Sequence, residues 1–562
     1  MRGHRPISKP RGRALGLAVA MAMSVIGATG AGHALAQDAA PKQEPPPLLA
    51  PGTQATAPPV IEVRQYLVLG VTLLEAAAVQ AALTGMTGRR TVEELHRAAA
   101  AVQALYAQAG YGAVVVYLPP QEVSAGVVTL QAIEGRLSAV RVEGSGPAFS
   151  EANILASLPA LKPGQTPRLD LLDAQLRMAN DNPAKRTRLV LLPGQQPEQT
   201  EAEVVVDAAA RRQLGLELDN TGTPSTGRFR ASVSWRDANT SGRDDVAELR
   251  LQVAPEHPER FAAASLTYRL PLYAHATMLD VYALLSDTRS DTITTAAGDL
   301  RFSGKGHLLG LRATRYLQRL GGFDRRLSLG IERRDQRNQC AIGTFSEEAC
   351  GAAGGDLAIT PLTLEFVLLG DAQLPLATSV ALVQGLALGG ERADRAAFDA
   401  VRPGARPEFT ALRAQLSGQR RLNAAGWDAG ARLAAQWSAH PLVPAMQFGA
   451  GGRSSVRGYE ERELSADHGV ALSLELSAPT WQPASGATLR PFVFADASVL
   501  RNRDEVPCSG TRQRCSLAAA GLGLRLDAPS VSASLDIGRA LRDGGTTARG
   551  HTRAHAWLRI VH

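Results

Sequence analysis

The feature that most constrains the fold is a regular alternation of apolar and polar residues from Arg211 to the end of the chain. Within 247–253 the odd positions are apolar, whereas the even positions are Glu248, Arg250 and Gln252. Because successive side chains of a strand point to opposite faces, such a segment has one apolar and one polar face. The pattern recurs at 470–477 and 521–527. Strands of about 10 residues with this alternation are typical of barrels that span a membrane.

Counting these segments predicts the size of the barrel. About 11 precede a Gly- and Arg-rich stretch at 449–462, and five follow it, at about 468–479, 487–500, 516–529, 531–541 and 551–562. We therefore expect a membrane β-barrel of about 16 antiparallel strands over 210–562, with both ends on one side of the membrane. A closed barrel leaves no backbone group unpaired in lipid. The alternative, a soluble β-sandwich or propeller, agrees less well with repeated strands that are charged on one face.

The polar faces of these strands would line a wet lumen of mixed charge. The charged residues expected there are Arg228, Arg230, Glu248, Arg250, Arg413, Glu475, Arg525, Asp527 and Asp536. Such a lining would not trap one type of charge.

The N-terminus has the organisation of a secretory signal. Five basic residues precede an apolar run at 14–28, and Ala34, Leu35 and Ala36 form a small-x-small cleavage site. We expect 1–36 to be a signal peptide and 37–60, which holds seven prolines, to be an extended linker. Nowhere else does an uncharged apolar run approach the roughly 20 residues of a spanning helix. Any membrane insertion of the mature chain must therefore use strands.

Charge and motif content exclude several classes of function. Of 60 basic residues, five lie in the expected signal peptide, which leaves 55 against 53 acidic residues. This near balance, without a basic and aromatic platform, gives no indication of nucleic-acid binding. We find no catalytic triad, metal cluster or phosphate-binding loop. The sequence thus predicts no enzyme activity, no catalytic residues, no metal site and no cofactor.

Residues 61–135 and 136–209 each predict a small α/β module of β-α-α-β-β order. The first has strands at 61–68, 112–119 and 127–135, and helices at 73–84 and after Thr91. Thr91 and Glu94 form a capping box at the start of the second helix, and Gly110 ends it. The second module has strands at 137–144, 187–194 and 200–209, and helices at 151–161 and 168–180.

Three motifs resemble those of a known family. Val456, Arg457, Gly458 and Tyr459 match the VRGY/F signature in the long sixth outer loop of two-partner secretion transporters, the TpsB-type exporters of haemolysins and filamentous haemagglutinins. The stretch 118–135 resembles the PxQ...G...EG stretch of their POTRA domains, and 180–183 resembles a segment after a helix of the second domain. The resemblance covers 61–562. It implies POTRA 1 at 61–135, POTRA 2 at 136–209 and a transmembrane barrel at 210–562.

The resemblance also implies a site in the lumen. The long outer loop, at 441–467, would carry Arg457 to a carboxylate on the inner wall. Asp496 is the expected partner, because Phe494, Asp496 and Ser498 share one strand face and resemble the family's FxDxG motif. Ser498 stands where the family has glycine. The loop would be the movable element that fills the lumen at rest.

By resemblance, the protein is an outer-membrane transporter that captures an unfolded exoprotein in the periplasm and exports it through the barrel. Capture would use exposed POTRA strand edges. The implied partners are a secreted TpsA-type exoprotein of β-helical form, outer-membrane lipid and the barrel-assembly machinery, with a monomeric transporter. The haemolysin activation attributed to relatives would be coupled export and folding.

The alternatives are a barrel-assembly factor of the same superfamily, which usually has more POTRA modules, and a passive porin, which needs neither POTRA modules nor the loop motif. An autotransporter would carry a passenger segment.

The four cysteines form two close pairs in irregular segments, Cys340 with Cys350 and Cys508 with Cys515. Neither pair has the CxxC spacing or nearby histidine expected of zinc. Three connectivities are possible for four cysteines. Proximity and an oxidising compartment favour the disulfides Cys340–Cys350 and Cys508–Cys515, in the fourth and seventh outer loops.

Overall fold

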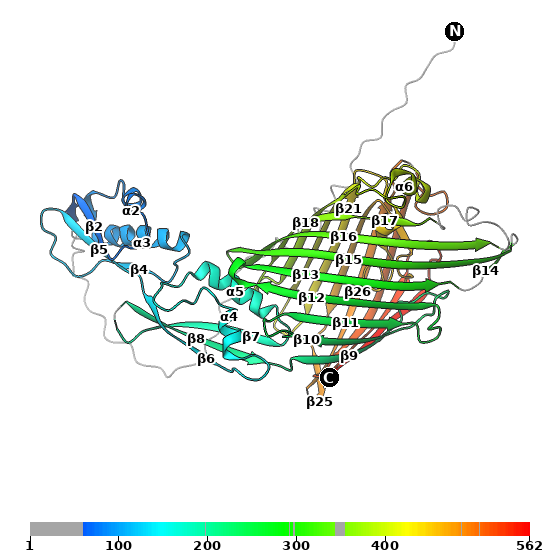
Figure 1. Cartoon of the computed structure of the whole chain (residues 1–562), viewed down its shortest axis with the longest axis horizontal. Helices are drawn as coiled ribbons and strands as arrows, with labels where there is room; N and C mark the ends of the chain where they lie inside the picture. Colours follow the sequence, from blue (N-terminus) through cyan, green and yellow to red (C-terminus); the bar gives the residue numbers. More distant parts are fainter. Residues whose placement is uncertain are drawn as a thin grey trace, which may run out of the picture. The chain divides into compact units, whose positions relative to one another are not determined.

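The computed structural model describes residues 60–562 except 197, 291–292, 296–297, 343–354, 485 and 505. The expected signal peptide and all of the linker except Val60 lie outside the described residues. Two α/β modules precede a closed antiparallel β-barrel (Figure 1). No helix in the described part of the chain is long and apolar enough to cross a membrane.

The barrel consists of sixteen long strands within the described residues, eleven before the long loop and five after it, as the alternation predicted. They are β9 (Arg212–Asp219), β10 (Arg230–Asp237), β11 (Val246–Val253), β12 (Phe261–Leu272), β13 (Thr277–Arg289), β15 (Gly298–Leu320), β16 (Phe323–Ile342), β18 (Pro361–Leu369), β19 (Leu376–Gly385), β20 (Thr410–Arg421), β21 (Asp428–Ser438), β24 (His468–Ser477), β26 (Ala487–Arg501), β27 (Arg514–Asp527), β28 (Val531–Ala540) and β29 (Thr552–Val561). The short strands β14 (Ile293–Thr295) and β25 (Trp481–Ala484) pair with the starts of β15 and β26, and β17 (Leu357–Ile359) pairs with residues 334–336 in the middle of β16.

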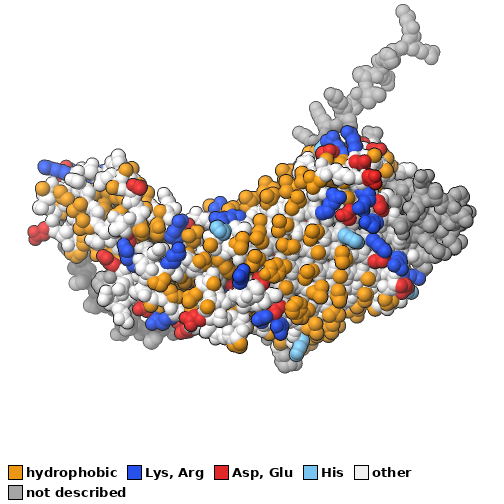
Figure 2. All heavy atoms as spheres, in the orientation of Figure 1, with side chains coloured by type: hydrophobic (Ala, Val, Ile, Leu, Met, Phe, Trp, Pro, Cys, Tyr) orange, Lys and Arg blue, Asp and Glu red, His pale blue; other side chains and the backbone are white. Residues whose placement is uncertain are grey.

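Each strand has an apolar outer face and a polar inner face. Leu249 and Leu251 of β11 are exposed on the outside, while Glu248 and Arg250 point inward. Hydrophobic side chains cover the outer surface of the barrel in a broad band (Figure 2). One expectation for the lumen is wrong: Arg228 lies before β10, in the loop after β9, where its backbone N–H donates to the Glu256 carboxylate. The alternation continues beyond the strand, so it does not mark where the strand begins.

The barrel closes between its first and last strands. β29 pairs with β9 at five positions, from Trp557 opposite Asp219 to Val561 opposite Gly215. Beyond them, the Asn220 carboxamide continues the ladder: its Oδ1 accepts from the Ala556 N–H at 2.9 Å and its Nδ2 donates to a carbonyl at 2.8 Å. A side chain thus adds to the backbone pairing at this seam, where the Asn220 N–H also donates to the Ala556 carbonyl.

The first module packs helices on a small sheet around one apolar core. Its elements are β1 (Val60–Val63), β2 (Gln65–Leu69), α2 (Ala76–Ala82), β3 (Gly88–Thr91), α3 (Val92–Gln108), β4 (Val115–Tyr117) and β5 (Val127–Ile133). The predicted capping box is present on α3, and Gly110 after it has a φ of +93°. The predicted strand at 61–68 divides at Arg64, because β1 pairs with β3 and β2 pairs with β5. The sequence of β3, GRRT, has no apolar alternation and was not predicted.

The second module has the predicted order around its own core. Its elements are β6 (Arg136–Glu143), α4 (Glu151–Ala156), α5 (Leu169–Asn180), β7 (Lys185–Pro193) and β8 (Gln199–Ala208). The prediction of a helix to residue 161 is wrong. Pro159 disfavours a helical conformation at Leu158, and the Ser157 hydroxyl donates to the carbonyl of Ile154 at 2.6 Å.

Candidate functional site

The connection between β21 and β24, residues 439–467, is a long hairpin that we call L6. Within it, η3 (Pro444–Met446) leads to β22 (Phe448–Ala450), which pairs antiparallel with β23 (Leu464–Ala466). The segment between these strands, 451–463, is the tip of L6 and contains the four motif residues. The contacts of the tip lie on the inner faces of the last five strands and on the loop between β28 and β29.

Arg457 binds the inner wall through its guanidinium and its backbone. Its Nε and Nη2 donate to the two carboxylate oxygens of Asp496, each at 2.8 Å, and its backbone N–H donates to the same carboxylate at 3.0 Å. Nη1 donates to Glu475 at 2.8 Å, and Nη2 to the Ser473 hydroxyl at 3.1 Å. Arg457 and Asp496 are both buried. One guanidinium therefore joins the loop to two adjacent strands, β24 and β26.

Neighbouring groups complete the environment of this guanidinium. It lies 3.5 Å from the centre of the Phe494 ring, close enough for a cation–π contact. Glu475 also accepts from Arg525 at 2.6 Å, and Asp536 lies 3.9 Å from Arg457. Three carboxylates thus surround two guanidiniums, so most of the charge in this part of the lumen is paired.

Gly458 brings the loop backbone into contact with β28 and β29. Its φ is +90°, a conformation that favours glycine. A Cβ at this position would lie 3.0 Å from the backbone of Gly538 on β28. The Gly458 N–H donates to Nε2 of the buried His555 on β29 at 3.0 Å. Glycines at both positions therefore permit this close approach.

The side chains of Tyr459 and Val456 pack the tip against the barrel wall. Both are fully buried, in a cluster with residues of β26 and β27. The Tyr459 hydroxyl lies 2.8 Å from the carbonyl oxygens of Ala518 and Arg542. The structure places all four motif residues at the inner wall, each with different contacts.

Glu463 holds the end of the tip to the loop between β28 and β29. Its carboxylate accepts from the Thr547 N–H at 2.8 Å, the Thr547 hydroxyl at 2.6 Å and the Thr546 N–H at 3.0 Å. Burial alone would raise the pKa of Glu463, but the hydrogen bonds from Thr547, Glu460 and Thr546 lower it below its ordinary value. The carboxylate is therefore charged at neutral pH.

Two family models match this chain. The model described as haemolysin secretion/activation protein ShlB/FhaC/HecB matches residues 199–526, and the model described as POTRA domain, ShlB-type, matches residues 61–135. The chain belongs to the ShlB/FhaC/HecB family.

Relatives within this family match shorter stretches. The outer membrane transporter CdiB of Dickeya dadantii is 27% identical over 187 residues, 33% of this chain and 32% of that protein. The heme/hemopexin transporter protein HuxB of Haemophilus influenzae is 22% identical over 220 residues, 39% of this chain and 38% of that protein. The chain thus aligns with about a third of the length of these curated relatives.

Solved structures show the same fold over nearly the whole chain. CdiB from Escherichia coli has a TM-score of 0.77 at 20% identity, covering 91% of this chain and 93% of that one. CdiB from Acinetobacter baumannii has a TM-score of 0.70 at 17% identity, covering 97% of both chains.

The stretch 118–135, which resembles a POTRA motif, stabilises the fold of the first module. The Gln121 carboxamide exchanges two hydrogen bonds of 2.7 Å with the backbone of Thr129. Glu134 accepts from the Tyr106 hydroxyl at 2.6 Å and from the Thr72 N–H at 2.8 Å. Burial, followed by the hydrogen bond to Glu134, raises the pKa of Tyr106. These residues therefore stabilise the module.

The second module is held to the barrel by buried polar contacts. Lys185 of β7, with a fully buried side chain, pairs with Asp244 in the turn after β10. Asp244 also accepts a hydrogen bond of 2.8 Å from the hydroxyl of Tyr273, which lies in η1 (Tyr273–His275). Burial lowers the pKa of Lys185, while Asp244 opposes this change. Asn182, in the 180–183 segment, donates to the Ala238 carbonyl at 2.7 Å.

The base of L6 is held by its neighbouring outer loops. The guanidinium of Arg402, which follows α6 (Arg395–Val401), donates to both oxygens of the buried Asp467, each at 2.5 Å. The same carboxylate accepts from the backbone N–H of Leu442 at 2.8 Å and from that of Arg503 at 2.9 Å. L6 is thus connected to the loops before β20 and after β26.

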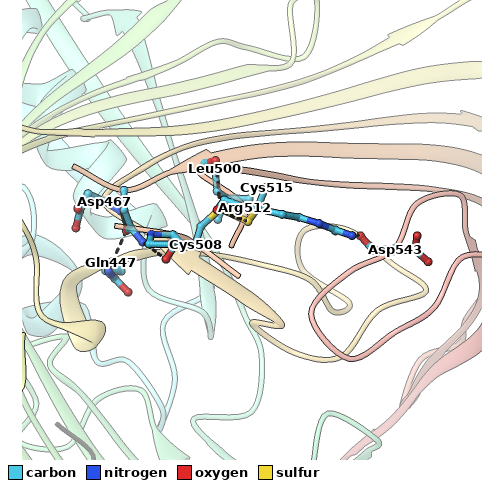
Figure 3. Close-up of a disulfide and its surroundings, with 9 residues drawn as sticks. Gln447, Asp467, Leu500, Cys508, Arg512, Cys515 and Asp543 are labelled. Atoms are coloured by element: carbon cyan, nitrogen blue, oxygen red, sulfur yellow. Dashed lines mark hydrogen bonds between the residues drawn. A yellow bond between two sulfur atoms is a disulfide. The ribbon is translucent and has the colours of Figure 1, made fainter. Parts of the chain in front are cut away.

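One of the two predicted disulfides, Cys508–Cys515, lies within the described residues. Cys508 and Cys515 are bonded, with Cα atoms 6.0 Å apart, at the beginning of β27 (Figure 3). Cys340 lies near the end of β16, and Cys350 lies outside the described residues, as does the predicted Cys340–Cys350 pair. No group of three or more possible metal ligands occurs in the described part of the chain.

Several residues of this site were not assigned to it from the sequence. Glu475 was expected only as a lumen residue, and Ser473, His555 and Glu463 were not assigned roles. A signal for Ser473 exists in the strand register, because it lies directly opposite Asp496. Ser498, the predicted departure from the family pattern, is buried, and its hydroxyl has no hydrogen-bond partner among the described residues.

Proposed function

We propose that this protein exports a secreted partner protein across the bacterial outer membrane, as a two-partner secretion transporter. The partner would enter from the periplasm in an unfolded state and leave through the barrel. The barrel would be monomeric, inserted by the barrel-assembly machinery and surrounded by outer-membrane lipid. The partner would be a TpsA-type exoprotein of β-helical form.

The observation that carries this proposal is the position of the L6 tip against the inner wall. A passive pore has no need of a loop whose arginine binds two carboxylates and a serine on adjacent strands. Arg457 joins the tip to two strands through five hydrogen bonds, so their loss would favour a second position of the loop, away from the wall. We infer that Arg457 and Asp496, with Phe494, hold L6 in the position that supports transport.

Capture of the partner is assigned to the two modules. β2 and β4 are the outer strands of the sheet β2-β5-β4, and β6 and β7 are the outer strands of β6-β8-β7. An extended chain can add to such an edge through main-chain hydrogen bonds with little demand on its sequence. This mode suits a transporter that receives its partner unfolded.

The family comprises transporters, and the proposal includes no enzymatic step. Activation of a haemolysin by such a protein is then export coupled to folding. The competing proposal is a barrel-assembly factor, which would act on other outer-membrane barrels.

Deleting the gene and comparing the proteins released into the medium tests the function. We expect one large secreted protein to disappear and to return when the wild-type gene is restored, while the amounts of other outer-membrane barrels stay constant. A general loss of barrels would favour the assembly factor. An unchanged set of released proteins, under conditions in which the gene is expressed, would contradict export.

A further inference from the structure

A row of cationic and imidazole side chains lies on the outer face of three adjacent strands. His468 of β24 is directly opposite Arg501 of β26, which is directly opposite Arg514 of β27. The neighbours Leu500 and Cys515 are buried on the inner face, so the two arginines point outward. We call these three residues the outer cation row.

The row lies at the end of the apolar band that faces lipid. On the same face, the next residues along the strands are Val470 and Val499, which are 43% and 48% exposed. The Trp437 ring is 52% exposed, and its centre lies 6.3 Å from that of His468. Tryptophan on the outside of a membrane barrel is typical of the boundary between hydrocarbon and headgroups. The row therefore lies at the level of the headgroups.

Within the described residues, no carboxylate compensates the two guanidinium charges of the row. No carboxylate among the described residues lies within 4.0 Å of the guanidinium of Arg501 or Arg514. The carboxylate of Asp467 is already bound by Arg402. Like charges directly opposite each other on neighbouring strands destabilise a sheet. An anion between the two guanidiniums would remove this repulsion.

A second outward row provides a contrast. Lys305 of β15 is opposite Arg337 of β16, but it is also opposite Asp287 of β13. On the next rung, Asp335 is opposite His307. Carboxylates are thus interspersed with those cations, whereas the outer cation row has none beside it in its register.

We propose that the outer cation row binds the phosphate group of a lipid in the outer leaflet. This rests on the barrel lying in the outer membrane, as proposed above, and not on the export of a partner. Adjacent strands are about 4.8 Å apart, so two guanidiniums can share one phosphate. Arginine binds phosphate oxygens through paired N–H donors. The acyl chains would lie over Val470, Val499 and Trp437.

The full-length protein in a neutral detergent allows a direct test. The probe is diphosphoryl lipid A, with bound lipid counted by native mass spectrometry. We expect the Arg501→Gln, Arg514→Gln double variant to bind about tenfold more weakly or worse, since each charge-assisted hydrogen bond contributes substantially. The matched control is Arg420→Gln. Arg420 faces outward near the C-terminal end of β20, at the opposite end of the barrel from the outer cation row. This variant should bind lipid as the wild type does.

Four further measurements make the outcome decisive. The Arg501→Lys, Arg514→Lys variant keeps both charges and should retain most binding, and a heat-modifiable band should show that each variant is folded. The proposal would be overturned if the double glutamine variant bound lipid A as tightly as the wild type does. It would also be overturned if the wild type bound a lipid without phosphate as tightly as it binds lipid A. Complete competition by inorganic phosphate at the same concentration would overturn it as well, since this would indicate a site for an adventitious ion only. None of these measurements depends on secretion, so failure of export would leave the lipid result unchanged.

Discussion

Removing the guanidinium of Arg457 is the most informative perturbation of L6. In Arg457→Ala, the buried Asp496 keeps only the backbone N–H at position 457 as a donor from the loop. Glu475 keeps Arg525. Breaking a buried ion pair by removing one partner costs about 3–5 kcal/mol. This corresponds to a change of roughly two hundred- to several thousand-fold in the population of the bound loop.

A change of this size is enough to shift a two-state loop almost completely. We therefore expect Arg457→Ala and Asp496→Ala each to abolish secretion of the partner. The double variant should be no worse than either single variant, because both remove the same interaction. Arg457→Lys should be intermediate, since an ammonium keeps the charge but cannot reproduce the planar pairing and the contact with Phe494.

The assay is the amount of partner in the medium relative to heat-modifiable barrel in the outer membrane. Barrel abundance should not change, because the strand ladder does not depend on the loop. Arg462→Ala is the matched control: Arg462 lies in the same tip and is exposed, and its guanidinium donates to two backbone carbonyls of L6 itself, those of Pro444 and Gln447. Normal secretion by Arg457→Ala at equal barrel abundance would refute the role assigned to this arginine.

Three other variants test neighbouring features. Tyr459→Phe removes a buried hydroxyl and should destabilise the bound tip by about 1–3 kcal/mol, measured as reduced secretion at constant barrel abundance. Replacing Cys508 and Cys515 with serine removes about 2–3 kcal/mol of local stability by the chain-entropy estimate and should increase proteolysis of that loop without changing secretion. Lys185→Met leaves Asp244 buried without its cation and should lower the thermal unfolding temperature, since such a loss costs about 3–5 kcal/mol. Adding Asp244→Asn should restore part of this stability, and no restoration would mean that the charge pair is not the cause.

The strands could be predicted because alternation is a local property. Burial on one face of a strand imposes a period of two on its sequence, so the inward position of Asp496 follows from its neighbours alone. Strand ends are less well determined, as Arg228 shows, because loop residues can continue the alternation by chance. The predicted helix at 151–161 is too long because Pro159 disfavours a helical conformation at the residue before it.

Most partners of the loop tip could not be predicted because they depend on spatial neighbours. Ser473 and Glu475 approach Arg457 only when the register of β24 against β26 is known. His555 lies 97 residues from Gly458 in sequence, on the strand that closes the barrel. Glu463 binds the loop between β28 and β29, whose path does not follow from any alternation or turn motif in the sequence.

The hydrogen bond between Gly458 and His555 has a consequence for the order of folding. The barrel strands that contact the motif residues, β24 and β26 to β29, all follow the motif in the chain, and His555 belongs to the last one. The bound state of the tip is therefore complete only after β29 has reached its place beside β28. Non-local contacts of this kind form late, because the loop-closure entropy must be overcome first. During assembly the tip remains incompletely bound, and a chain shortened at its C-terminus would have a loop that never reaches its final position.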